Sequence, residues 1–355
     1  MSTDAEHVRH YQLTHTTTYT YPHPVTSSYG RAVLLPRHGG GQRVHASGLD
    51  LQPRAAHSAE HRDFAGNRSA FFHVTTEHHR LTVSAVSVVT TNRRRQDPAR
   101  LPDTPWEQVA QLVRSVEEAG PNSTIGGPNT VLTIAESRLP SPLVDVTEEV
   151  RAYAAPSFVP GRPLTEVILD LAGRIHADFD FSPGATSVGT RLPEILQRRV
   201  GVCQHFSHLL VGAARSMGLA ARYVSGYIET RPPPGEPKLR GVDASHAWAA
   251  IWLPGGGWLH IDPTNDQFID SRYVTLGWGR DYGDVSPLRG IVLTEGSGSS
   301  LDVAVDLWPI TSEQMPAAIE EVQERLPQTS SPAGRHPGGG HDTGEAPRVG
   351  QASAG

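Results

Sequence analysis

Three residues in the second half of the chain carry the side chains that catalysis by a cysteine nucleophile requires: a thiol, an imidazole and a carboxylate. Cys203 is the only cysteine among 355 residues, so it cannot form a disulfide within the chain. His246 and Asp262 follow it at spacings of 43 and 59 residues. A cysteine nucleophile requires a base to take or hold its proton, and that base requires an orienting group. These residues are the candidates for the three roles.

The residues around Cys203 predict a helix that begins at or near the thiol. Gly201 precedes it, and the apolar residues after it recur at helical spacing: Phe206, Leu209, Leu210, Ala213, Ala214 and Met217. Free backbone N–H groups and the helix dipole at such a position favour the thiolate, which is the nucleophilic form. A free cysteine is most often a small buried hydrophobic residue, so position alone leaves that interpretation open. The downstream His246 and Asp262 favour the nucleophile.

His246 and Asp262 are predicted on neighbouring strands, residues 246–253 and 258–262, joined by Pro254-Gly-Gly-Gly. Successive residues of a strand point to opposite faces of a sheet. The pairing register across this loop therefore decides whether the imidazole and the carboxylate can meet.

Two registers are possible. A plain four-residue loop pairs Leu253 with Trp258 and places Asp262 on the face away from His246. A five-residue loop or a glycine bulge pairs Trp252 with Trp258, and Asp262 becomes the same-face diagonal neighbour of His246 at roughly 7–8 Å between backbones. We predict the second register, because the glycines allow the positive φ angles that a bulge requires. The first register would remove Asp262 as the orienting residue.

A family resemblance emerges from four short motifs in one order: Gly201-Val-Cys-Gln, Ala221-Arg-Tyr-Val-Ser-Gly-Tyr, Asp243-Ala-Ser-His-Ala-Trp, and Gly257-Trp through Asp262-Pro-Thr-Asn. Together they resemble the bacterial transglutaminase-like superfamily of papain-like cysteine enzymes. The stretch from Tyr11-Gln-Leu to Leu35-Pro-Arg resembles the β-rich region that precedes this core in bacterial members. Gly279-Arg-Asp-Tyr-Gly-Asp-Val-Ser-Pro resembles the segment behind it. The resemblance covers most of residues 8 to 310.

This resemblance implies a Cys–His–Asp triad, with Cys203 as nucleophile, His246 as base and then acid, and Asp262 as orienting residue. The implied reaction is acyl transfer through a thioester on an amide or peptide bond of a protein or peptide. Ammonia or an amine leaves, and water or an amine accepts the acyl group. The superfamily includes crosslinking transglutaminases, peptidases and amidases, so hydrolysis and transamidation both stay open.

The chain departs from the family at His205, where members often carry Asp after the Cys-Gln pair. We expect His205 to point outward into solvent; an inward, protonated imidazole would instead favour the thiolate. The backbone N–H of Cys203 is a reasonable oxyanion donor, whereas Gln204 is left between a site role and a packing or capping role. The residues that match the trailing motif either line the cleft or hold the core together: Arg280, Asp281, Tyr282 and Asp284.

A zinc site is the main chemical alternative. The thiol and imidazole ligands available for it are Cys203, His205, His208, His246 and His260, of which His205 and His208 have chelating i, i+3 spacing. The chain lacks paired cysteine spacing and has no Asp/Asn-rich calcium loop. We therefore predict neither a metal nor a cofactor. The functional alternative is a catalytically silent binding scaffold that kept the fold.

The composition limits partners and compartment. A net charge of −6 argues against a nucleic-acid footprint, and no apolar run approaches the roughly 20 residues of a membrane span. The polar first residues lack the apolar stretch of a signal peptide, and the chain has no paired cysteines. We expect a cytoplasmic protein that binds neither nucleic acid nor membrane. The sequence leaves the oligomeric state open.

The predicted fold class is α+β. Short strands with frequent turn signals predict a sandwich-like β domain over residues 1–92, and residues 93–160 are predicted as a linker and helical connection. Residues 161–310 are predicted as the catalytic core, in which the helix that carries Cys203 packs on an antiparallel sheet. Residues 311–355 are predicted as a short helix and a disordered tail.

Overall fold

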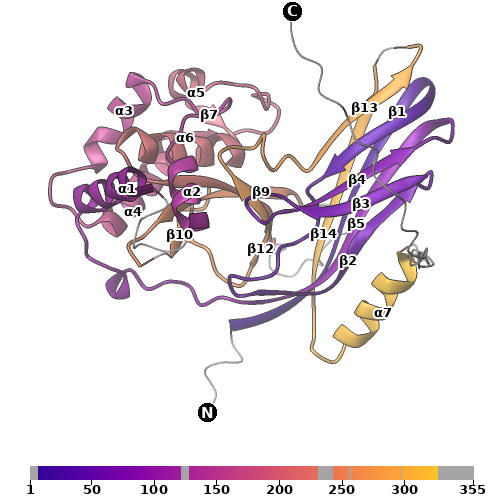
Figure 1. Ribbon diagram of the computed structural model, residues 1–355, viewed down its shortest axis with the longest axis horizontal. Coiled ribbons are helices and arrows are strands. Elements are labelled where there is room, and N and C mark those ends of the chain that lie inside the picture. Colours follow the sequence, from indigo (N-terminus) through magenta and orange to yellow (C-terminus); the bar gives the residue numbers. More distant parts are fainter. Residues whose placement is uncertain (1–6, 121–127, 231–242, 256, 297, 327–355) are drawn as a thin grey trace, which may run out of the picture.

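The computed structural model describes residues 7–120, 128–230, 243–255, 257–296 and 298–326 (Figure 1). Its helices are α1 (Trp106–Ala119), α2 (Pro128–Glu136), α3 (Glu148–Ala154), α4 (Leu164–Asp178), α5 (Leu192–Arg198), α6 (Cys203–Ser216) and α7 (Met315–Arg325), with short 3₁₀ turns η2 (Pro98–Arg100) and η4 (Ala155–Ser157). Its strands are β1 (Val8–Ala32), β2 (Gln42–Gln52), β3 (His57–Arg62), β4 (Arg68–Val74), β5 (His78–Asn92), β6 (Asp180–Phe181), β7 (Val200–Gly201), β8 (Ala221–Ile228), β9 (Ser245–Trp252), β10 (Trp258–Asp262), β11 (Gln267–Phe268), β12 (Tyr273–Gly279), β13 (Leu288–Thr294) and β14 (Ser300–Ile310).

The long strand β1 organises the N-terminal antiparallel sheet. An irregularity between Thr20 and Val25 divides β1 in two: its first half pairs with β5 and β14, and its second half pairs with β4 and β13. Apolar side chains from both halves form one buried cluster, including Leu81 and Val83 of β5 and Phe72 of β4. Two parts of one sheet thus cover each other, as the sandwich-like prediction for this region requires.

Residues 288–310 lie in this N-terminal sheet, although the sequence interpretation grouped them with the core. β13 and β14 pair with β1 over most of its length, and α7 packs on β2 and β5. Figure 1 shows both strands beside β1, away from the core helices α1 to α6. The cause is non-local: β1 offers a second edge that the first 92 residues leave unpaired, and only the end of the chain fills it.

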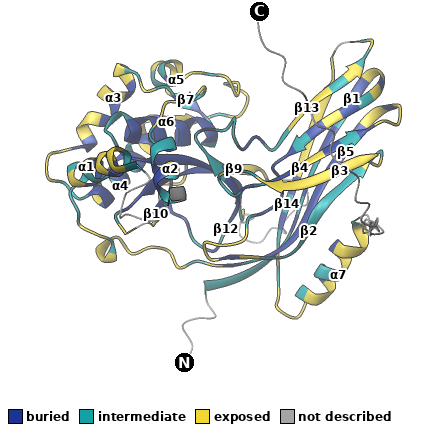
Figure 2. Cartoon of the chain, viewed as in Figure 1, coloured by how far each residue is buried: buried dark blue, intermediate teal, exposed yellow. Residues whose placement is uncertain are grey.

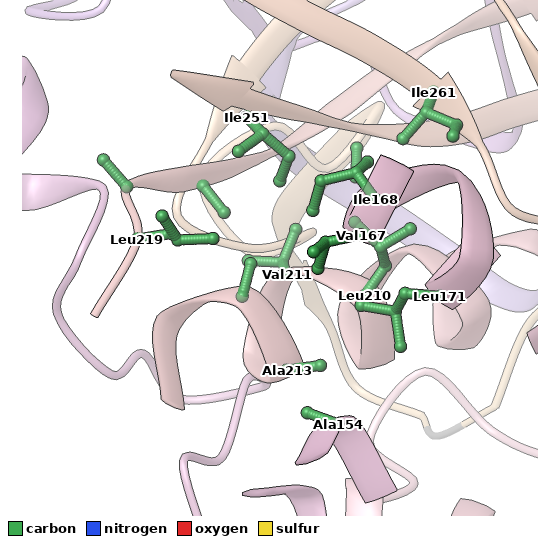
Figure 3. Close-up of a cluster of buried hydrophobic side chains, with 14 of the residues drawn as sticks. Ala154, Val167, Ile168, Leu171, Leu210, Val211, Ala213, Leu219, Ile251 and Ile261 are labelled. Atoms are coloured by element: carbon green, nitrogen blue, oxygen red, sulfur yellow. The ribbon is translucent and has the colours of Figure 1, made fainter. Parts of the chain in front are cut away.

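The core combines helices with an antiparallel sheet in the order β11-β10-β9-β8-β12 among the described residues. Helix α6 is buried on nearly all sides, with Leu210, Val211 and Ala213 fully inaccessible, because it packs on β8 and β9 and also contacts α3, α4 and α5. Figure 3 shows Ala213 facing Ala154 of α3, and Ile168 of α4 between α6 and the sheet. Gly218 ends this helix as expected, since its φ of 85° belongs to the left-handed region. The predicted α+β arrangement is confirmed, with the cysteine helix packed on the sheet.

Figure 2 shows that burial is deepest in α6 and the central core strands, whereas β3 and most of α7 are exposed. The two halves of the chain share a buried cluster in which Tyr11 and Leu34 of the N-terminal region contact Tyr227 and Leu276 of the core sheet. Within the described segments, no helix combines the length and the apolar character needed to cross a membrane. The predicted tail, residues 327–355, lies outside the described residues.

Candidate active site

The Cys203 thiol stands at the first residue of α6, where the sequence predicts it. Val202 is the extended N-cap, and the half-buried Cys203 packs against Tyr223, Ala247 and Val285. The first backbone N–H groups of a helix have no intrahelical acceptor, so the thiol lies beside free donors and the positive end of the helix dipole. This position favours a negative charge on sulfur or on a bound oxyanion.

The predicted strand register is confirmed. β9 and β10 pair Trp252 with Trp258 and Ala249 with Ile261, so the next residue, Asp262, lies opposite Trp248 and on the face of His246. The loop closes with a hydrogen bond from the Leu253 N–H to the Gly257 carbonyl (2.9 Å), and Gly255 has a φ of 95°. The glycine run therefore does what the prediction required of it: it shifts the pairing by one residue.

The register brings the imidazole and the carboxylate into direct contact. His246 Nε2 lies 2.6 Å from Asp262 Oδ2, and both side chains are buried. Since Nε2 is engaged by the carboxylate, Nδ1 is the ring nitrogen left to face Cys203. The structure thus brings together Cys203, His246 and Asp262 from the start of α6, the start of β9 and the end of β10.

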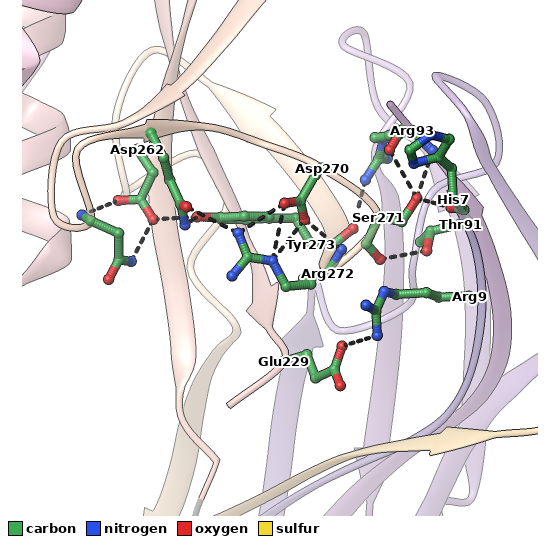
Figure 4. A network of polar contacts seen from close by, with 12 residues as sticks. His7, Arg9, Thr91, Arg93, Glu229, Asp262, Asp270, Ser271, Arg272 and Tyr273 are labelled. Atoms are coloured by element: carbon green, nitrogen blue, oxygen red, sulfur yellow. Dashed lines mark hydrogen bonds and ion pairs between the residues drawn. The ribbon is translucent and has the colours of Figure 1, made fainter. Parts of the chain in front are cut away.

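Asp262 is surrounded by hydrogen-bond donors. Oδ2 also accepts hydrogen bonds from Asn265 Nδ2 (2.7 Å) and Tyr273 Oη (2.8 Å), and Oδ1 accepts from the backbone N–H groups of Thr264 (2.9 Å) and Asn265 (3.3 Å). Gln267 Nε2 donates to Tyr273 Oη (2.7 Å), so the tyrosine hydroxyl is left to donate to the carboxylate. Figure 4 shows Tyr273 between Asp262 and the Asp270–Arg272 ion pair. These donors stabilise an ionised carboxylate.

The electrostatics of the pair follow from this packing. Burial by itself would lower the pKa of His246. The charge of Asp262, its hydrogen bond to the ring and the hydrogen bond between the ring and the Cys203 side chain outweigh burial, and the pKa of His246 rises to about 10. Burial would raise the pKa of Asp262, but the charge of His246 and the hydrogen bonds from His246, Asn265 and Tyr273 keep it below its ordinary value. At neutral pH the site therefore holds an imidazolium against a carboxylate.

The free energy of unfolding should depend on pH because of the His246–Asp262 ion pair. Because the pKa of His246 is higher in the folded than in the unfolded chain, its stabilisation is complete below pH 6.5 and disappears as the pH rises through about 10. We expect the free energy of unfolding of the wild type to exceed that of His246→Gln by on the order of a few kcal/mol at pH 6, and the gap to narrow steadily up to pH 10. Urea unfolding of both proteins at several pH values measures this gap; a constant gap would contradict the raised pKa.

The expectation that His205 points into solvent is wrong. Its side chain is 1% exposed: Nδ1 accepts from the Val202 N–H (3.3 Å), and Nε2 lies 3.0 Å from the Ser187 carbonyl oxygen. Burial lowers the pKa of His205, so it is a neutral cap of α6 and not a second cation beside the thiol. The loop 182–190 covers His205 at the start of α6. Because this loop is distant from His205 along the chain, the residues next to His205 gave no signal that the side chain would be buried.

The other nearby polar residues have mainly structural contacts. Gln204 Nε2 donates to the Val188 carbonyl oxygen (3.0 Å), which favours its packing role. His208 Nε2 accepts from the Tyr282 N–H (3.0 Å), and burial lowers the pKa of this histidine to about 3. Among the described residues, the zinc candidates do not form a group of three or more ligands around one point.

The trailing motif divides between the two expected roles. Arg280 pairs with Asp284, and the buried Asp281 accepts from the Leu143 N–H (2.9 Å) and the Gly283 N–H (2.7 Å), so these three hold the core together. Tyr282 is different, because its ring packs with Tyr223 in the cluster that contacts the thiol.

Sequence reasoning missed the residues that support Asp262. Asn265 was part of a recognised motif and had no assigned role, while Tyr273 and Gln267 were not considered. An asparagine three residues after a strand-end aspartate is a local signal for Asn265. No such signal exists for Tyr273, because it reaches the carboxylate only through the pairing of β12 with β8.

Comparisons with known proteins identify the family of this chain. The family model of the bacterial transglutaminase-like N-terminal region matches residues 11–90, and that of the transglutaminase-like superfamily matches residues 151–263. An uncharacterised protein of Mycobacterium tuberculosis is 43% identical over 311 residues, which cover 86% of this chain and 95% of that protein. An uncharacterised protein of Mycobacterium leprae is 32% identical over 83% of this chain and 97% of its own length.

More distant relatives carry functional names. A protein-glutamine gamma-glutamyltransferase of Pseudomonas aeruginosa is 33% identical over 93 residues, which are 25% of this chain and 14% of that protein. The crystal structure of "a Putative Cysteine Protease" from Cytophaga hutchinsonii superposes with a TM-score of 0.65 at 17% identity, covering 86% of this chain and 92% of that one. At 17% identity, the similarity to the Cytophaga hutchinsonii structure shows a shared fold. The chain described here belongs to the transglutaminase-like superfamily and carries the bacterial transglutaminase-like N-terminal region ahead of its core.

Proposed function

We propose that this chain is a cysteine enzyme that transfers acyl groups from amide or peptide bonds of proteins or peptides through a thioester on Cys203. The observation that carries the proposal is the His246 ring, which is held by Asp262 through Nε2 and has its other nitrogen on the side of the only thiol in the chain. This is the arrangement of nucleophile, base and orienting group that covalent acyl transfer requires.

The proposed reaction has two steps. The Cys203 thiolate attacks the amide carbonyl carbon, and the backbone N–H of Cys203 at the start of α6 donates to the oxyanion. The His246 imidazolium then gives its proton to the departing ammonia or amine, which leaves a thioester. In the second step neutral His246 removes a proton from water or an amine as it attacks the thioester, and the thiolate is released as the acyl product leaves.

Asp262 has a positioning role in this scheme. It holds the imidazole in the orientation that points Nδ1 at the sulfur and stabilises the cation in each half of the cycle. Its lowered pKa keeps the carboxylate ionised through both steps. The scheme draws on the side chains of this chain alone. Cytoplasmic location and a protein or peptide partner remain proposals beside it.

Alkylation of Cys203 distinguishes an enzyme from a silent scaffold. Because Cys203 lies at the start of α6 and beside the His246 ring, we expect one equivalent of iodoacetamide to react rapidly at pH 6. An ordinary cysteine is less than about 1% thiolate at that pH, so His246→Ala should slow the reaction by about 100-fold. The single cysteine makes the mass increase unambiguous, and His61→Ala on the exposed strand β3 is the matched control. Slow labelling of the wild type, with normal rates only above pH 8, would point to the scaffold.

The acceptor is a separate question. Casein incubated with the protein and a fluorescent primary amine reports transamidation as fluorescence on intact casein, peptidase activity as smaller fragments, and deamidation as released ammonia without either. Each outcome assigns one branch of the proposed reaction.

A further inference from the structure

A second site of unusual composition lies where the N-terminal region meets the core sheet. The cavity there has a volume of about 550 Å³, and the residues that define its character are arginines and tryptophans: Arg37, Arg93, Arg222, Trp258 and Trp278. Gly39–Gly41 contributes backbone to one wall, and all three glycines have positive φ angles, which only glycine adopts readily. None of the described residues that line this cavity is an aspartate or a glutamate.

Arg222 is the centre of the cavity. Its guanidinium carbon lies 3.9 Å from the Trp258 ring centroid and 3.8 Å from that of Trp278, and Arg37 lies 3.4 Å from the Trp278 centroid. Two cations and two indoles therefore alternate in a stack. Arg222 is only 5% exposed, and its Nε is buried without a hydrogen-bond partner. This one strong donor of the guanidinium is thus desolvated and unused.

The neighbouring arginines are held in place by neutral acceptors. Arg93 donates to the carbonyl oxygens of Gly40 (2.7 Å) and Tyr273 (2.6 Å), and Arg37 donates to the Ala65 carbonyl (2.9 Å) and Asn67 Oδ1 (2.6 Å). Burial lowers the pKa of Arg37 and of Arg93 to about 10, and it lowers that of Arg222 strongly. The charge of Asp63 partly compensates Arg37, but no carboxylate among the described residues acts on the pKa of Arg93 or Arg222. Fixed cations without a counter-charge are costly in a protein interior, and an anion among them removes that cost.

His260 adds a neutral donor. Its Nδ1 accepts a hydrogen bond from Trp248 Nε1 (3.0 Å), so the proton of the ring is on Nε2. Burial lowers the pKa of His260, and the charges of Arg222 and Arg93 lower it further, which keeps the ring neutral. The imidazole lines the cavity together with the guanidinium groups and can donate to the same ligand.

This cavity is separate from the thiol. Tyr223 packs beside Cys203 on the α6 side of the sheet, and the adjacent Arg222 points to the opposite face. His246 lies on the same face as Arg222 but at the start of β9, four residues before Ala250, which is the partner of Arg222. None of the three candidate active-site residues lines the cavity. A ligand bound there would not occupy the position of an amide substrate.

We propose that the cavity binds a phosphoryl-type oxyanion, as free inorganic phosphate or as the phosphate group of a small metabolite. Guanidinium groups match the oxygens of phosphate through paired, charge-assisted hydrogen bonds, and the Nε of Arg222 is a buried donor without a partner. The flanking indoles Trp258 and Trp278 add flat apolar surface on which a planar group attached to the phosphate could stack.

Calorimetric titration tests this proposal. Inorganic phosphate and AMP are titrated separately into the wild type at constant ionic strength in chloride, and we expect saturable 1:1 binding below about 10 mM for at least one of them. Arg222→Gln should weaken the binding at least tenfold, whereas Arg100→Gln makes the same charge change at an exposed side chain and should leave it unchanged. Tighter binding of AMP than of phosphate identifies a metabolite; equal binding identifies the free ion.

Two results would overturn the proposal. One is the absence of saturable binding of both probes to the wild type, a measurement that does not depend on any variant folding. The other is binding that Arg222→Gln and Arg100→Gln weaken equally, since that would be a general effect of net charge. If Arg222→Gln does not fold, Arg222→Lys serves in its place: it keeps the charge but loses the planar donor fork, so it should still weaken the binding.

Discussion

Replacing Cys203 with alanine should abolish the modification of casein, whether it is measured as amine incorporation, cleavage or ammonia release. The thiolate forms the covalent intermediate, so its removal leaves no path through a thioester, and the rate should fall by at least about 10³-fold. The site can accept the change without unfolding, because Cys203 is half-buried at a helix start and makes only modest apolar contacts.

The controls for this variant are conformational. Circular dichroism and the melting temperature of Cys203→Ala should match those of the wild type, since alanine is compatible with the first turn of α6. Cys203→Ser provides the isosteric comparison and should be nearly as inactive, because a hydroxyl is far less acidic than a thiol. Wild-type rates in either variant would show that the chemistry does not pass through Cys203.

The second large effect is expected from Asp262→Asn, which preserves the shape of the side chain and removes its charge. Every group that contacts the two carboxylate oxygens is a donor, so an asparagine NH₂ must face donors whichever way the amide is turned. We expect kcat to fall by about 10³–10⁴-fold, because the imidazolium loses its counter-charge and its orientation. We also expect a loss of about 1–3 kcal/mol in the free energy of unfolding, because a buried donor is left unpaired.

Tyr273→Phe is the matched comparison for this prediction. It removes one of the donors to Asp262 and retains the carboxylate, the ring and its packing against Trp248. Its kcat should fall by only about tenfold, and the rate of Cys203 alkylation at pH 6 should fall less than in His246→Ala. Activity of Asp262→Asn within threefold of the wild type would show that Asp262 does not orient His246, whatever its contacts.

The anion site and the candidate active site share structural neighbours. Arg93 donates to the carbonyl oxygen of Tyr273, whose hydroxyl donates to Asp262, and Trp248 lies against His246 while it donates to His260. The polar contacts in Figure 4 continue from Tyr273 to Arg93, and from Arg93 through Ser271 to Thr91 of the N-terminal region. The N-terminal sheet therefore supports the strand that carries Tyr273 as well as one wall of the cavity.

Local sequence patterns predict two features of the candidate site. The start of α6 follows from the apolar periodicity after Cys203, and the register of β9 and β10 follows from strand alternation and the glycine run at 255–257. Both depend on residues close together in the chain, for which helix and hairpin geometry allow few alternatives. The strand β3 and the helix α2 lack such patterns: β3 is wholly exposed and does not alternate, and α2 starts inside a segment rich in glycine and proline.

Other features depend on residues that are far apart in the sequence and come together only in the folded protein. The pairing of β13 and β14 with β1, the burial of His205 under the loop 182–190, and the hydrogen bond from Tyr273 to Asp262 each follow from packing between separate elements. The arginine cavity depends most on such packing. Arg37 and Arg222 both stack on the indole of Trp278, although 185 residues of sequence separate the two arginines. Such contacts form because whole sheet faces must be buried against one another. The hydrophobic pattern of a single segment does not show which distant segment will cover it.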